Sequence, residues 1–146
     1  MRRQHKPIRI ALRKTIILKA PREKVWDYLT QPEHLAKWFH PPKAPLAAGA
    51  PLKMYGAESG DLVIWGDVIA ADPPSYLEYT FTVTPMGDAV STVKWTMTEV
   101  PGGTLLALEH LGLPEDAAAM DLLMALDKGW DEHMGRMRND LNQKAA

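Results

Sequence analysis

The chain has 146 residues, a formal net charge of −1 and no cysteine. This length predicts a single domain over residues 1–146, because domains commonly contain about 100–150 residues. The lack of cysteine excludes disulfides, thiolate catalysis and cysteine-ligated metal sites, and it is typical of a reducing compartment, so we expect a cytoplasmic location. We expect no secretion signal and no membrane insertion, because no apolar run approaches the ~20 residues that cross a bilayer.

Basic residues are concentrated at the start of the chain, where 9 of the 17 lysines and arginines lie within the first 24 residues. Such a cluster can bind nucleic acid or an anionic membrane surface. No stacking aromatic residues are interleaved with it, however, so we interpret it as the solvated face of a first strand. We therefore expect no nucleic-acid partner.

Residues 8–18 alternate between apolar and polar side chains, which is the period of a half-buried strand. Lys14 falls on the apolar side of this pattern, so we expect either a bulge or a lysine whose charged end reaches water. Residues 1–7, before the strand, are expected to be flexible.

Two short helices are predicted next, in the stretch from residue 20 to residue 39. Pro21 suits a first helical turn, and Pro32 ends one helix and can begin another. The proline-rich segment 40–51 cannot form regular structure. We expect its residues Pro41–Pro51, together with the helix that carries Trp38, to border the mouth of a pocket.

From residue 51 the chain is predicted to form a meander of strands, separated by turn residues at 56–61, 72–75, 85–88 and 101–103. One-sided alternation in successive strands is typical of an antiparallel sheet with one wet face. A long helix follows from about Pro114, and it must lay its apolar stripe on the inner face of the sheet. We interpret Gly129 in this helix as a point where helix and sheet approach closely. The stripe consists of Leu123, Asp127, Trp130, Met134, Met137 and Leu141.

Four blocks of the sequence resemble, in order and spacing, the activator-of-heat-shock-protein-ATPase-like family of the START-like (SRPBCC, birch-pollen-allergen) superfamily. They are APREKVWDYLTQPEHLAKWF, GDVIAADPPSYLEYTF, GGTLLALEHLGL and GWDEHMGRMRNDL. The resemblance implies an α+β helix-grip fold, in which a curved antiparallel sheet wraps around the long C-terminal helix, with two short helices after the first strand. It also implies an apolar cavity between sheet and helix. Superfamily members bind lipids, steroids and polyketides, or act as cyclases, hydrolases or dehydratases.

Common catalytic and metal-binding motifs do not occur in the sequence. There is no phosphate-binding glycine loop, no H-E-x-x-H and no G-x-S-x-G, and the five histidines lack metal-ligand spacing. We expect no metal and no cofactor. Two polar residues, His110 and Asp127, interrupt apolar faces; they either orient a ligand inside the cavity or reach water at its rim.

The leading hypothesis is binding of a small apolar or amphipathic molecule between the sheet and the long helix. One alternative is an enzyme that uses His110 or Asp127 as acid or base in the same pocket. Another is a protein-interaction module, although a chain of this length has no room for the additional domain with which the namesake co-chaperone contacts its chaperone. The oligomeric state, monomer or homodimer, stays open. The predicted pocket lining is Trp38, Met54, Tyr79, Phe81, Trp95, Met97, Leu108, His110, Asp127, Trp130 and Met134.

Overall fold

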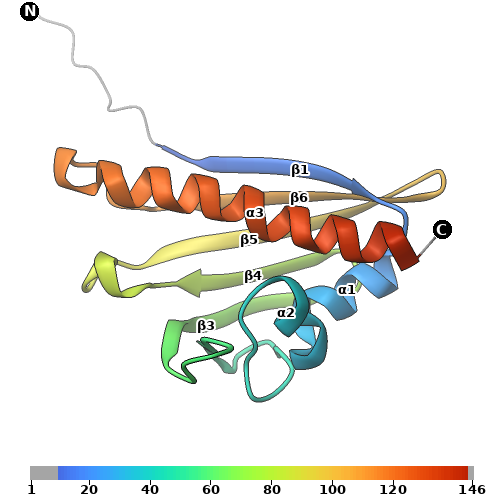
Figure 1. Cartoon of the computed structure of the whole chain (residues 1–146), viewed down its shortest axis with the longest axis horizontal. Coiled ribbons are helices and arrows are strands. Elements are labelled where there is room, and N and C mark those ends of the chain that lie inside the picture. The colour runs from blue at the N-terminus through green and yellow to red at the C-terminus, as the bar shows by residue number, and fades with distance from the viewer. Residues whose placement is uncertain (1–9, 145–146) are drawn as a thin grey trace, which may run out of the picture.

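The computed structural model describes residues 10–144. The segment 1–7, which we expect to be flexible, and residues 8–9 of the predicted first strand lie outside the described residues. The six strands form one antiparallel sheet in the order β1-β6-β5-β4-β3-β2, and a long helix lies along one face of it (Figure 1). The predicted α+β helix-grip fold is confirmed.

The elements follow the predicted order. The strands are β1 (Leu12–Leu18), β2 (Pro51–Tyr55), β3 (Leu62–Asp72), β4 (Tyr76–Phe81), β5 (Ser91–Val100) and β6 (Gly103–Leu111). The helices are α1 (Arg22–Thr30), α2 (Pro32–Trp38) and α3 (Met120–Lys144), with short 3-10 turns η1 (Thr84–Met86) and η2 (Ala117–Ala119).

The break between α1 and α2 has a local cause. Gln31 is extended (φ −92°, ψ 133°) because it precedes Pro32, and a residue before proline is driven out of the helical region. The chain therefore leaves α1 and begins again, with Pro32 in the first turn of α2.

The long helix begins later than the sequence predicts, at Met120 instead of Pro114. The Glu115 carboxylate accepts a hydrogen bond from the backbone N–H of Ile10 at 2.8 Å. Glu115 therefore ties this segment to the chain just before β1, and regular helix starts only after the 3-10 turn η2.

Trp130 is the centre of the contact between α3 and the sheet. Its side chain is buried, and its ring lies 5.5 Å from the Trp95 ring on β5 and 6.0 Å from the Phe81 ring on β4. Its indole N–H donates to His110 Nδ1 on β6 at 3.0 Å. One side chain of the helix thus contacts three neighbouring strands.

A buried chain of hydrogen bonds continues from Trp130 into the sheet. His110 Nδ1 accepts, so the proton of the neutral ring is on Nε2, which donates to Ser91 Oγ at 2.8 Å. The Ser91 hydroxyl in turn donates to the carbonyl oxygen of Phe81 at 2.7 Å. Both ring nitrogens of His110 are therefore occupied inside the core, and burial lowers the pKa of His110 to about 4.

Truncation of Trp130 is expected to destabilise the fold in two separable ways. Trp130→Ala should lower the free energy of unfolding by about 3–5 kcal/mol, because it leaves a cavity under the helix. Trp130→Phe keeps most of the apolar volume but leaves His110 Nδ1 without a donor, so it should lower stability by about 1–3 kcal/mol. Urea unfolding measures both effects, and a loss below 1 kcal/mol for Trp130→Ala would contradict the central role of this contact.

The buried His110 should also make stability depend on pH. Its native pKa of about 4 lies below the ~6.5 of an unfolded histidine, so the unfolded chain takes up the proton first. The stability that neutral His110 contributes is complete above pH ~6.5 and is lost as pH falls towards 4, by about 2 kcal/mol between pH 7 and pH 5.

The control for this prediction is His110→Gln, whose amide can accept from Trp130 and donate to Ser91 but does not titrate. Unfolding free energies of the two proteins should converge as the pH falls from 7 to 5. Parallel curves would mean that His110 does not carry the effect.

Candidate functional site

The space between α3 and the middle of the sheet is filled by side chains. Trp38 and Trp95 meet edge to face with ring centroids 5.9 Å apart, and both indole N–H groups donate to partners inside the core. A ligand would have to displace these rings to occupy this space. Eight of the predicted lining residues belong to this packed core: Trp38, Met54, Tyr79, Trp95, Met97, Leu108, His110 and Met134.

Open space lies beside this core, on the side of α3 that faces β3 and β4. It is a cleft of about 190 Å³, which we call the helix–sheet cleft. Among the predicted lining residues, only Phe81 and Trp130 reach it. Its walls are Phe39, His40, Val63, Ile64, Phe81, Val83, Ala125, Leu126, Gly129, Trp130 and His133.

Gly129 helps to keep the cleft open. A Cβ added at Gly129 would meet no atom within 4 Å, so this glycine does not serve the close approach of helix to sheet that the sequence suggests. Glycine inside a helix lowers stability by roughly 0.5–1 kcal/mol relative to alanine. Here it leaves a gap in the helix surface that faces the cleft.

Two imidazoles form the polar part of the cleft wall. His40 follows α2 and His133 lies on α3, with ring centroids 5.5 Å apart. His133 Nδ1 lies 3.0 Å from the carbonyl oxygen of Trp38 and is also in contact with the Arg136 guanidinium. Burial and the positive charge of Arg136 together lower the pKa of both histidines, to about 4 for His133. Both rings are therefore neutral at pH 7.

Asp127 does not line this cleft and reaches water, which is the second of the two alternatives that the sequence left open for it. The Asp127 carboxylate is about half exposed and accepts a hydrogen bond from Lys14 Nζ at 2.7 Å, while Asp131 lies 3.0 Å from the same ammonium. Burial alone would lower the pKa of Lys14, but hydrogen bonds to the two carboxylates outweigh it and raise the pKa. Lys14, the charged residue on the apolar side of the first strand, thus forms an ion pair with Asp127, the charged residue in the apolar stripe of α3.

The proline-rich segment contributes little to the cleft. None of residues 41–51 lines it, and His40 lies immediately before them. Residues 42–46 instead form a separate shallow hollow with the start of β2, where the Lys43 ammonium lies 4.6 Å from the centre of the Tyr55 ring.

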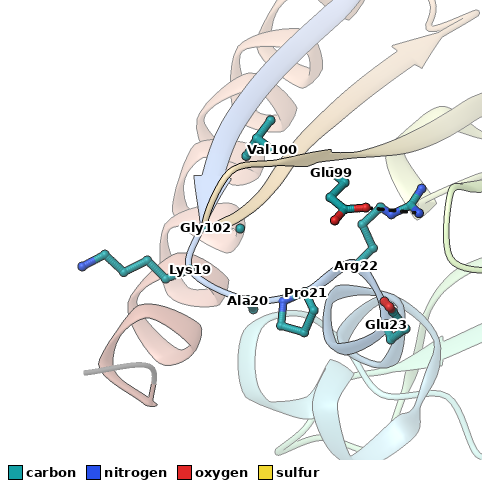
Figure 2. A pocket seen from close by; sticks show the side chains of 9 residues that line it. Lys19, Ala20, Pro21, Arg22, Glu23, Glu99, Val100 and Gly102 are labelled. Atoms are coloured by element: carbon teal, nitrogen blue, oxygen red, sulfur yellow. Dashed lines mark ion pairs between the residues drawn. The ribbon is translucent and has the colours of Figure 1, made fainter.

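Another hollow, of about 310 Å³, lies where the β1–α1 connection meets the β5–β6 turn (Figure 2). Arg22 reaches across it, donating to Ser75 Oγ at 3.0 Å and lying 3.8 Å from the Glu99 carboxylate. A Cβ at Gly103 would lie 2.0 Å from the carbonyl oxygen of Leu18, so the strands must approach closely here. Because the Arg22 guanidinium already binds Ser75 and lies near Glu99, we interpret this hollow as a structural junction.

Neither a metal centre nor a membrane span is found within residues 10–144. No three histidine, aspartate or glutamate side chains there are grouped so that they could hold a metal ion. None of the helices in that range is long and apolar enough to cross a membrane.

The model of the Activator of Hsp90 ATPase homolog 1-like protein family matches residues 19–141. The chain belongs to this family. The match confirms the resemblance that the four sequence blocks indicate. No curated protein matches the sequence.

Solved structures share the fold of this family member. MLL2253 from Mesorhizobium loti is 25% identical with a TM-score of 0.80, and the match covers 92% of this chain and 98% of that one. The Aha1 dimer from Colwellia psychrerythraea is 17% identical with a TM-score of 0.75, covering 91% and 96%. DynU16, a protein of the dynemicin biosynthetic locus, is 24% identical with a TM-score of 0.76, covering 88% of this chain and 46% of that one. The chain therefore spans about half the length of DynU16, and identities this low show the fold alone.

The ion pair of Lys14 should make a small, salt-sensitive contribution to stability. Lys14→Met keeps the apolar stem but leaves Asp127 and Asp131 unpaired one helical turn apart, so the free energy of unfolding should fall by about 0.5–1 kcal/mol. The loss should shrink in 1 M salt, because the carboxylates are exposed and screened. Urea unfolding at low and high salt measures it, with Asp121→Asn on the same helix as the control; a loss that salt does not change would contradict the ion pair as its source.

Proposed function

We propose that the protein binds a small apolar molecule in the helix–sheet cleft. The observation that carries this proposal is an open space with apolar walls beside a filled core, next to a helix glycine that no close contact requires. Aromatic rings of Phe39, Phe81 and Trp130 face this space. Ligand sites in proteins are concave, mostly apolar and furnished with a few polar groups, and the imidazoles of His40 and His133 supply those groups.

The size of the cleft sets the size of the ligand. At about 190 Å³ it is below the ~300–1,000 Å³ of typical drug-sized sites but above the ~150 Å³ of an engineered cavity that binds benzene. A molecule with a single ring fits this volume. A steroid or a lipid chain would require α3 or the segment after α2 to move.

Acid–base chemistry by His110 or Asp127 has little structural support. His110 uses both ring nitrogens inside the core, and Asp127 pairs with Lys14 at the surface. If the cleft supports a reaction, His40 and His133 are the titratable groups that touch its space.

The proposal is tested by filling the cleft from the helix side. Gly129→Leu places an apolar side chain into the space and should abolish binding of benzyl alcohol, a single-ring probe. Folding should be preserved, because replacing a helix glycine by leucine favours the helix by roughly 0.5–1 kcal/mol. Binding is measured from amide chemical shifts in nuclear magnetic resonance titrations, which should move at Gly129 and Trp130 in the wild type.

The matched control is Gly135→Leu. Gly135 lies on the same helix, a Cβ there also meets no atom within 4 Å, and it does not line the cleft. This variant should bind the probe as the wild type does. The proposal is wrong if the wild type shows no saturable shifts at the cleft, or if Gly129→Leu binds as tightly as Gly135→Leu.

A further inference from the structure

Three imidazole nitrogens of residues that line the helix–sheet cleft form no hydrogen bond within the described residues. Nε2 of His133 and both ring nitrogens of His40 form no hydrogen bond within residues 10–144, and none of them is sealed in the interior. All three nitrogens belong to side chains that line the cleft. They are available to the polar end of a bound molecule.

Two groups beside His133 Nδ1 require opposite protonation states of that nitrogen. The carbonyl oxygen of Trp38, 3.0 Å away, requires a proton on Nδ1, whereas the Arg136 guanidinium requires a lone pair there. A single ring nitrogen satisfies only one of them. When Nδ1–H donates to Trp38, the guanidinium beside it lacks an acceptor.

Arg136 also lacks a counter-ion in the described part of the chain. Arg13 pairs with Glu109 and Arg22 lies near Glu99, but Arg136 forms no ion pair within residues 10–144. Glu132, one turn away on α3, lies instead 3.9 Å from Lys128. The Arg136 guanidinium is exposed and touches His133, which lines the cleft, and its planar donors match the geometry of a carboxylate.

We propose that the ligand of the helix–sheet cleft is a small carboxylic acid, whose carboxylate accepts from the Nε2–H of His133 and draws the Arg136 guanidinium away from Nδ1 to itself. This inference rests on the proposed function, because the apolar part of the acid must occupy the cleft. A single aromatic ring would lie among Phe39, Phe81 and Trp130, with its carboxylate directed to the rim. An ionised carboxylate has two oxygens and can accept from both donors.

Proton balance gives this arrangement a measurable consequence. In the free protein a neutral His133 that donates from Nδ1 has a lone pair on Nε2, so it must take up one proton from solvent before Nε2 can donate to the carboxylate. The groups that face His133 are Arg136 and Glu132 on α3 and His40 after α2. Burial, with Arg136 and His40, holds the pKa of His133 near 4, and a bound carboxylate opposes these effects and raises that pKa. Binding near pH 6 is therefore accompanied by proton uptake.

The test compares benzoate with benzyl alcohol, which has the same ring but no charge. By calorimetric titration near pH 6, we expect the wild type to bind benzoate at least tenfold more tightly than benzyl alcohol. Arg136→Gln should abolish this preference by weakening benzoate alone. Arg138→Gln removes the same charge from an exposed position two residues away and should keep the preference.

Proton uptake tests His133 separately. Benzoate titrations in two buffers with different ionisation enthalpies should give different heats for the wild type and equal heats for His133→Gln. Equal affinities for benzoate and benzyl alcohol in the wild type, or unchanged uptake in His133→Gln, would overturn the carboxylate site while leaving the cleft as a binding site. If neither compound binds, the proposed function fails and the carboxylate site fails with it.

Discussion

The contact between α3 and the sheet depends on Trp130, which combines a large apolar ring with a hydrogen-bond donor that must be satisfied when buried. The ring packs against β4 and β5, while its N–H reaches His110 on β6 and continues to Ser91 and the Phe81 carbonyl. Packing alone would tolerate sliding of the helix along the sheet. The buried hydrogen bonds do not, because any shift would leave a polar atom without a partner in the core. The position of every other residue on α3 follows from this register.

That register decides where open space is left. With Trp130 seated over the middle of the sheet, the interior is filled by Trp38, Trp95 and their neighbours. The remaining space lies beside the helix, over β3 and β4, where Gly129 offers no side chain to fill it. In this family member the open space therefore lies at the edge of the helix–sheet contact.

Polar residues on apolar faces have two different explanations in this structure. His110 is polar because the indole of Trp130 requires an acceptor, so it supports the core. Lys14 and Asp127 form an ion pair at the β1 edge of the same interface, where the Asp127 side chain is about half exposed. The polar side chains of the cleft wall are instead His40 and His133, neither of which interrupts an apolar face in the sequence pattern.

The element order, the alternation of the strands and the apolar stripe of α3 could be predicted from the sequence, because they depend on local periodicity and on prolines such as Pro32. The order and spacing of four weak motifs also identified the family correctly. The alternation of inward and outward residues in β6 correctly predicted that His110 faces inward. It could not show that both ring nitrogens form hydrogen bonds there, because their partners, Ser91 and Trp130, lie on another strand and on the helix. Only the tertiary structure decided which side of α3 remains open, because that depends on side-chain volumes meeting across elements far apart in the chain. For the same reason the sequence could not show that His133 contacts both His40 and Arg136, or that Lys14 pairs with Asp127.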